Sequence, residues 1–143
     1  MNNLTLLNRA VILKAKMLLG TLLLVMGFNN SSYANDVAGK TILAKGKVES
    51  IDKISKEKRT LRRRSEIFTV DNITTGAKSK AQFSMSDGGL ITLKENTELI
   101  VSNYQFTPEV GKSSATLELV NGGLRSISGM IKKSGGDYQV KTP

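Results

Sequence analysis

The 143-residue sequence contains no cysteine, no histidine and no tryptophan. Without cysteine there is no disulfide to stabilise the fold and no thiol nucleophile, and without histidine there is no imidazole base. The usual ligand sets for zinc are excluded for the same reason. Aromatic residues make up only 5% of the chain, so a surface that stacks on sugars or bases would have to use Tyr104, Tyr138 or a phenylalanine.

The first 34 residues have the composition of an export signal. Three basic residues and no acidic residue precede a largely apolar run: Arg9, Lys14 and Lys16, then Met17–Phe28. Small residues at Ser32 and Ala34 predict cleavage between Ala34 and Asn35. A membrane anchor is the alternative, but crossing a bilayer takes roughly 20 apolar residues and this run is shorter. We therefore expect a signal peptide over 1–34, a mature domain over 35–143, and a protein that is periplasmic or secreted.

Positive charge exceeds negative charge, with 21 Lys and Arg against 12 Asp and Glu and a net charge of +9. Only three of the basic residues lie in the predicted signal peptide, so the mature chain stays basic. A basic exported protein is attracted to the anionic polymers of a cell envelope. This attraction does not identify a specific ligand.

A short block occurs twice, 34 residues apart: Phe83-Ser-Met-Ser-Asp-Gly-Gly-Leu90 and Leu117-Glu-Leu-Val-Asn-Gly-Gly-Leu124. In each copy, alternating apolar residues are typical of a strand with one face on a core. Asp-Gly and Asn-Gly supply the positive φ angles of tight hairpin turns. The repeat therefore predicts two β-hairpins built from a repeated β unit.

Alternation of apolar residues continues along the rest of the mature chain, whereas no helical period of useful length follows residue 35. The strands it predicts cover 41–50 with a bend at Gly46, 81–85, 90–93, 99–106, 116–120, 124–131 and 138–141. Between the first two, apolar residues from Ile67 lead into a segment that Gly76 closes as a turn. After the signal peptide helix we expect an all-β domain. It would be a small twisted two-sheet roll or a short β-solenoid built from hairpins, with a plain β-sandwich as the alternative.

An ordered series of turn and strand residues resembles the FecR domain over roughly residues 39–143. The series consists of Asp71, Ile73, Thr75, Gly76, Asp87, Gly88, Ile91, Leu93, Asn96, Thr97, Gly122, Leu124, Arg125 and the segment Val140-Lys-Thr-Pro143. Eight of these are expected to act in turns, as side chains that bond to backbone amides or as glycines with unusual backbone angles: Asp71, Thr75, Gly76, Asp87, Gly88, Asn96, Thr97 and Gly122. They define a fold and need not form a site.

The resemblance implies a role in FecR-type signalling, in which a periplasmic domain receives a signal from an outer-membrane transporter and a cytoplasmic part controls a sigma factor. This sequence shows no cytoplasmic anti-sigma segment. It is similar to exported proteins in which a signal peptide leads directly into a FecR domain. Members of the family usually continue beyond the Lys-Thr-Pro segment with another strand, so we expect the last strand to be an unpaired edge.

A basic segment between the first predicted strands is the candidate interaction patch: Lys53, Lys56, Lys58, Arg59, Arg62, Arg63 and Arg64. Arg62, Arg63 and Arg64 form its centre. It would contact an envelope protein or an anionic envelope polymer, unless it is simply a solvated hairpin arm. Nucleic acid is disfavoured, because an exported protein rarely meets it and no aromatic residue interrupts the basic residues.

Catalysis and metal binding find little support in the sequence. Ser50 and Lys53 have the spacing of a Ser/Lys nucleophile pair, but the companion motifs are absent. Asp71, Asp87 and Asn96 carry oxygen ligands for calcium, but they lie on separate predicted turns. We therefore expect no enzyme activity, no cofactor and no metal. The expected function is ligand or protein binding and sensing in the envelope, and the alternative is a structural module that binds polysaccharide or peptidoglycan.

Overall fold

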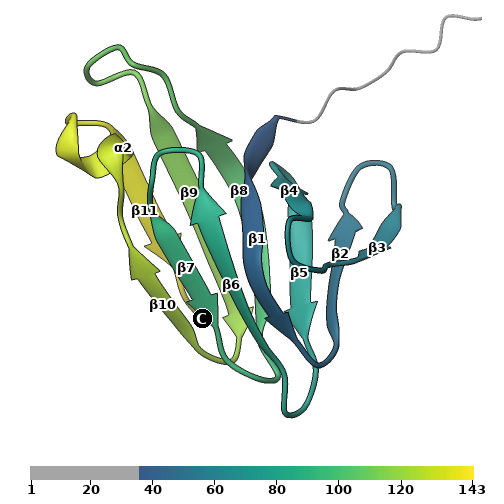
Figure 1. Ribbon diagram of the computed structural model, residues 1–143. Coiled ribbons are helices and arrows are strands. Elements are labelled where there is room, and N and C mark those ends of the chain that lie inside the picture. Colours follow the sequence, from purple (N-terminus) through teal and green to yellow (C-terminus); the bar gives the residue numbers. More distant parts are fainter. Residues whose placement is uncertain (1–35) are drawn as a thin grey trace, which may run out of the picture. The chain divides into compact units, whose positions relative to one another are not determined.

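The computed structural model describes residues 36–143, and these residues form two β-sheets and one short helix (Figure 1). The predicted signal peptide over 1–34 and its cleavage site after Ala34 lie outside the described residues and remain predictions. The expectation of an all-β, two-sheet domain is confirmed. No helix within residues 36–143 is long and apolar enough to cross a membrane.

The first sheet, here called sheet A, faces the viewer in Figure 1 and has the strand order β10-β7-β6-β1-β4. Its strands are β1 (Val37–Lys45), β4 (Glu66–Phe68), β6 (Lys80–Met85), β7 (Leu90–Leu93) and β10 (Leu124–Ile127). All of its pairs are antiparallel. Asp87 and Gly88 make the tight turn between β6 and β7, as the first copy of the repeat predicts.

The second sheet, sheet B, lies behind sheet A and has the order β11-β9-β8-β5-β2-β3. Its strands are β2 (Val48–Asp52), β3 (Lys58–Thr60), β5 (Asp71–Thr75), β8 (Glu98–Gln105), β9 (Ser114–Asn121) and β11 (Asp137–Lys141). Within the described chain only β11 and β9 pair in parallel. β11 is bonded to β9 along one side and to no strand of residues 36–143 along the other, so the last strand is an edge strand with one unpaired edge, as expected.

One core lies between the two sheets. It forms because alternate residues of most strands point inward and are apolar. Its members come from both sheets and from the segments that join them: Ala38, Val48, Leu61, Ile67, Ile73, Ala81, Phe83, Met85, Ile91, Leu93, Leu99, Val101, Tyr104, Ala115, Leu117 and Ile131. This shared core supports a two-sheet arrangement better than a short solenoid.

The second copy of the repeat does not form a hairpin, contrary to the prediction. After Asn121-Gly122-Gly123 the chain leaves sheet B, and β10 pairs with β7 of sheet A. The Gly123 N–H donates to Oγ1 of Thr97 at 3.0 Å, and its carbonyl accepts from the N–H of Lys94 at 2.9 Å. These bonds direct the chain toward β7 and away from β9.

A similar change of sheet occurs earlier in the chain. Gly46 has φ +75° and separates β1 in sheet A from β2 in sheet B. The predicted bend in one strand is thus a boundary between two strands. A Cβ at Gly46 would lie 3.0 Å from Cβ of Ser79, so the crossing depends on the missing side chain.

The predicted strand over 124–131 ends at Ile127 and gives way to a one-turn helix, α2 (Met130–Lys133). Asp87 positions this turn, because its carbonyl accepts from the N–H of Met130 at 2.9 Å. One of its carboxyl oxygens, Oδ2, accepts from the N–H of Ile131 at 3.3 Å. Ile131 is fully buried and anchors the turn in the core.

Candidate functional site

The fold divides the predicted basic patch into three parts. Lys53 and Lys56 lie in the turn between β2 and β3, and Lys58 and Arg59 belong to β3. The third part is the connection from β3 to β4, which carries Arg62, Arg63 and Arg64. The three parts occupy the end of the domain where β3 of sheet B approaches β4 of sheet A (Figure 1).

The β2–β3 turn is held in a defined shape by one carboxylate. Oδ1 of Asp52 accepts from the N–H of Ile54 at 2.7 Å and from the N–H of Ser55 at 2.8 Å. The Asp52 carbonyl accepts from the N–H of Lys56, whose φ is +63°. At the tip the Ile54 side chain is 63% exposed and stands between the two lysines of the turn. The turn therefore presents an apolar side chain flanked by positive charge on an ordered backbone.

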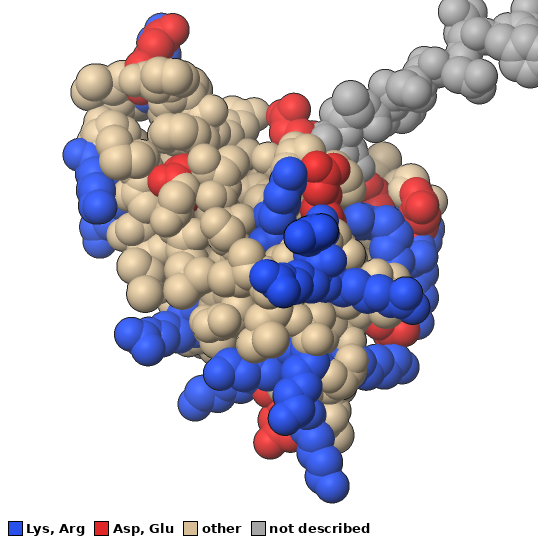
Figure 2. Space-filling view, viewed as in Figure 1, with Lys and Arg blue, Asp and Glu red and all other residues tan. Residues whose placement is uncertain are grey.

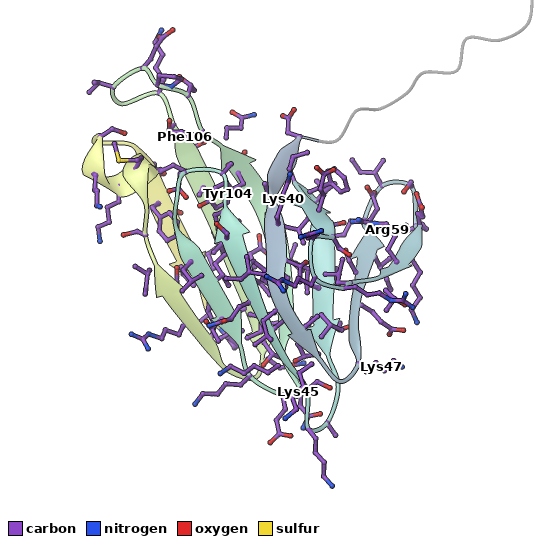
Figure 3. The ribbon with its side chains drawn as sticks, viewed as in Figure 1. Lys40, Lys45, Lys47, Arg59, Tyr104 and Phe106 are labelled. Atoms are coloured by element: carbon purple, nitrogen blue, oxygen red, sulfur yellow. The ribbon has the colours of Figure 1, made fainter. Side chains whose placement is uncertain are left out.

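Arg59 is an internal residue of the fold, although the sequence places it in the exposed patch. Its Nη2 lies 2.7 Å from Oδ2 of Asp71, a carboxyl group with no exposed surface. Its Nη1 donates to the carbonyl of Glu66 at 3.1 Å, and its guanidinium lies 4.8 Å from the centre of the Phe68 ring. Figure 3 shows Arg59 pointing back into the domain at this end. It joins β3, β4 and β5, so its guanidinium group is already engaged within the domain.

Lys58 is also engaged within the domain. Its Nζ lies 3.2 Å from Oε2 of Glu49, and Nζ of Lys47 lies 3.5 Å from the same oxygen. Burial raises the pKa of Glu49, but the two lysines outweigh this effect and hold the pKa below its ordinary value. Glu49 consequently stays ionised and neutralises part of the charge on this strand pair.

Arg62, Arg63 and Arg64 are exposed beside β1. The N–H of Arg64 donates to the carbonyl of Thr41 at 2.8 Å, and the N–H of Thr41 donates to the carbonyl of Ser65 at 2.8 Å. The N–H of Arg62 is bound by Oγ of Ser65 at 2.9 Å. This short extension of sheet A orders the backbone and leaves the three guanidinium groups without an ion pair among the described residues.

Among the signature residues, Asp87 joins three separate parts of the domain. It is 2% exposed, and its Oδ1 accepts from the N–H of Gly89 at 2.9 Å and from the hydroxyl of Tyr104 at 2.6 Å. Burial, followed by the hydrogen bond to Asp87 and its charge, raises the pKa of Tyr104 well above its ordinary value of 10.0. Asp87 therefore fixes the β6–β7 turn, β8 and α2 in one hydrogen-bonded group.

Five other signature residues meet at the opposite end of the strands: Thr75, Gly76, Asn96, Thr97 and Gly122. The Thr75 hydroxyl donates to the carbonyl of Lys94 at 2.6 Å and accepts from the N–H of Thr97 at 3.0 Å. The N–H of Asn96 donates to the carbonyl of Gly76 at 3.1 Å. Turns that are far apart in the sequence are thus bonded to one another.

The remaining candidates from the sequence are dispersed. Asp71, Asp87 and Asn96 lie on β5, in the β6–β7 turn and in the β7–β8 turn, and residues 36–143 contain no group of three acidic, cysteine or histidine side chains suited to a metal ion. Ser50 is fully buried on β2, whereas Lys53 lies in the exposed turn.

These features define a two-sheet all-β domain in which buried polar side chains tie turns and edges together. A family model described as FecR protein matches residues 71–143, just over half of the chain, and the chain belongs to that family. Membership connects it with FecR-type signalling and sensing. The matched part begins at Asp71, so it is shorter than the predicted resemblance over 39–143. A search of curated proteins found no match, and a search of solved structures found none either.

Two functional features were missed in the sequence. Ile54 is an apolar residue inside a basic turn, and its position two residues after Asp52, between Lys53 and Lys56, was the available signal. The internal role of Arg59 could have been recognised from its spacing to Leu61, because residues two apart on a strand share a face and Leu61 is buried.

Proposed function

We propose that the domain is an exported, non-enzymatic sensing module that binds an envelope protein through the β2–β3 turn. The observation that carries this proposal is the exposed Ile54 between Lys53 and Lys56, on a turn that Asp52 holds in place. Family membership supports a role in FecR-type signalling.

The physical character of the turn fits a protein partner. An exposed aliphatic side chain gains free energy when a pocket on the partner covers it, and flanking cations select an acidic rim. The bonds from Asp52 already order the backbone, so little conformational entropy is lost on binding. The partner surface would therefore have an apolar pocket with carboxylates around it.

A non-enzymatic role is supported by the use of the signature side chains. Asp71 binds Arg59 and the N–H of Phe68, and Asp87 binds Tyr104 and two backbone N–H groups. Thr75 and Thr97 bind the backbone of neighbouring turns. Each of these four side chains makes structural contacts within the domain.

The export part of the proposal is tested by the intact mass of the native protein from the envelope fraction. We expect an N-terminus at Asn35 and recovery in the periplasm or the medium. An uncleaved N-terminus would overturn export and make Met17–Phe28 an anchor.

The binding part is tested by a photo-crosslinking residue in place of Ile54, compared with the same residue in place of Val110. Val110 is 82% exposed in the β8–β9 loop and is the matched control. We expect one discrete protein adduct from position 54, lost on Lys53→Glu and Lys56→Glu, and no such adduct from position 110. Equal labelling from both positions, or an adduct that survives charge reversal, would contradict the proposed contact.

A further inference from the structure

Three lysines form a row across adjacent strands of sheet A. Lys45 of β1 is directly opposite Lys80 of β6 in the antiparallel register. On the other side of β6, Ala81 is opposite Leu93, which brings Lys94 at the end of β7 level with Lys80. All three side chains are exposed, and they stand on neighbouring strands about 4.8 Å apart.

Arg125 extends this row to a fourth strand. Thr92 of β7 is opposite Arg125 of β10, so the arginine is placed diagonally from Lys94. The Lys94 side chain runs over Gly123 toward β10, since a Cβ on Gly123 would lie 2.8 Å from its Cδ. Each of the four strands β1, β6, β7 and β10 thus contributes one cation to the same end of one sheet face.

The row is accompanied by a shallow depression but by few negative charges. Lys78, Ser79, Lys80, Lys94 and Glu95 line a depression of about 440 Å³. The Glu95 carboxylate accepts from the N–H of Lys78 at 2.6 Å. Within residues 36–143 no ion pair is formed by Lys45, Lys80, Lys94 or Arg125, whereas nearby Lys40 pairs with Glu66. Figure 2 shows Lys and Arg side chains gathered over the lower part of this face, with few Asp and Glu among them.

Like charges directly opposite each other on neighbouring strands are unfavourable. A row of three such lysines therefore costs stability in the free protein, and a polyanion lying across the strands would relieve the repulsion. Local rules of sequence design are typically broken where a surface serves another purpose. The row is a binding-site candidate for this reason, and not merely because it is basic.

We propose that this face of sheet A binds an anionic glycan, whose carboxylate or phosphate groups contact the row formed by Lys45, Lys80, Lys94 and Arg125. Between the cations, Gln82 and Thr92 offer hydrogen-bonding groups for hydroxyls, and they already contact each other at 3.2 Å. The single aromatic side chain on β1, β6, β7 and β10 is Phe83, which is fully buried. Base stacking on these four strands is thus unavailable, which disfavours single-stranded nucleic acid at the row.

This inference rests on the proposed function in one respect, namely that an exported binding domain meets such polymers. The surface is different, because none of these four cations belongs to the β2–β3 turn. Crosslinking at position 54 and glycan binding can consequently fail independently of each other.

The test compares two variants that lose the same charge. The row variant carries Lys45→Gln, Lys80→Gln, Lys94→Gln and Arg125→Gln. The control carries Lys112→Gln, Lys132→Gln, Lys133→Gln and Lys141→Gln, which are exposed cations outside sheet A. Calorimetry would measure binding to polygalacturonate, to a glycerol-phosphate polymer and to neutral dextran at two or more salt concentrations. Anionic phospholipid vesicles and single-stranded DNA would be titrated in the same way as competing ligand classes.

We expect the unaltered protein to bind at least one of the two anionic polymers, more weakly at higher salt, and not to bind dextran. The row variant should lose about tenfold or more in affinity, and the control should stay within about threefold. Polygalacturonate and the phosphate polymer distinguish carboxylate from phosphate as the recognised group.

Three results would overturn the proposal. They are equal loss in both variants, binding to neither anionic polymer, and binding to anionic phospholipid vesicles or single-stranded DNA in their place. A thermal unfolding scan at low salt without ligand checks the premise. The row variant should unfold at a higher temperature than the unaltered protein because the repulsion is removed, and a lower temperature would contradict it.

Discussion

Asp71 has no exposed surface, and its charge is balanced by one residue, Arg59. Oδ2 of Asp71 receives both Arg59 and the N–H of Phe68, whereas Oδ1 has no hydrogen-bond partner among the described residues. An ion pair of this kind contributes little net free energy while it is intact, but loss of one partner leaves a buried charge without compensation. Both partners must therefore be present for β3, β4 and β5 to pack together at this end of the domain.

Arg59→Ala should lower the free energy of unfolding by about 3 kcal/mol, because it leaves Asp71 buried and unpaired. The value lies at the low end for buried pairs since the Arg59 side chain is 24% exposed. Urea unfolding followed by circular dichroism measures the change. The control is Lys58→Ala, whose exposed pair with Glu49 should contribute under about 1 kcal/mol. Similar losses in both variants would show that Arg59 is not a buried partner.

Tyr104 gives the domain a dependence on alkaline pH. In the unfolded chain its pKa is close to 10, whereas burial and Asp87 raise the pKa in the folded state. Above pH 10 the unfolded state loses the proton and the folded state keeps it, so stability falls as pH rises. The contribution is complete below pH 10 and is lost by about 1.4 kcal/mol per pH unit above it.

Tyr104→Phe should reduce the slope of the unfolding free energy against alkaline pH by the contribution of one proton. Unfolding in urea between neutral pH and pH 11 would measure it. The substitution also removes the bond to Asp87 and should cost about 2 kcal/mol at neutral pH. Tyr138 provides the comparison, because burial raises its pKa as well while its bond to Ser126 acts in the opposite direction. An unchanged slope in Tyr104→Phe would show that Tyr104 titrates normally in the folded protein.

At the scale of the elements, the described chain passes between the two sheets several times, and two of these crossings depend on glycine. One lies at Gly46, between β1 and β2, and the other at Gly122 and Gly123, between β9 and β10. At each of these two crossings, a strand of one sheet is followed directly in the chain by a strand of the other sheet. Any other residue at Gly46 or Gly122 would have to accept a left-handed backbone as well as a collision.

Gly122→Ala should cost about 2 kcal/mol more than Gly88→Ala, and unfolding in urea measures both. Each glycine has a positive φ, +88° and +80° respectively, so each substitution carries the backbone penalty. A Cβ at Gly122 would also lie 2.5 Å from Cα of Thr97, whereas Gly88 has open space around it. Equal losses in the free energy of unfolding would mean that the turn at Thr97 can shift to make room for the added Cβ at no cost.

Local sequence identified most strands but could not identify the second crossing. Asp87-Gly88-Gly89 and Asn121-Gly122-Gly123 have the same turn chemistry, yet only the first closes a hairpin. The difference comes from Thr97, which captures the N–H of Gly123 from 26 residues away. Such a bond depends on the final arrangement of two turns, and no short-range pattern encodes it.

The candidate surfaces were predictable to different degrees. The pairing of Lys80 with Lys94 follows from the β6–β7 hairpin, whose turn at Asp87-Gly88 fixes the register. The place of Lys45 beside them does not, because β1 reaches β6 through long-range pairing. The basic segment from Lys53 was recognised as a unit, but its partition into exposed and internal cations depends on the buried Asp71.

At the scale of the whole described domain, one core serves both sheets. Phe83 of β6 and Leu99 of β8 are fully buried and come from opposite sheets. If one sheet unfolds, the apolar inner face of the other sheet loses the surface that covers it. Residues 36–143 should therefore lose structure in a single transition.

Phe83→Ala and Leu99→Ala should each lower the free energy of unfolding by about 3 to 4 kcal/mol. Urea unfolding would be followed by far-ultraviolet circular dichroism and by tyrosine fluorescence, and the two curves should coincide in both variants. Separation of the curves in one variant alone would show that the sheets unfold independently.

The two ends of the described domain are held very differently. Near its start, β1 is bonded along both edges, to β4 and to β6, whereas β11 is bonded within the described chain to β9 alone. If the domain were pulled between Asp36 and Lys141, β11 would detach first, while β1 would resist until sheet A itself failed. Tension would thus expose one edge of β9 before it disturbed the lysine row. The last strand is therefore the element of the domain that yields first under force.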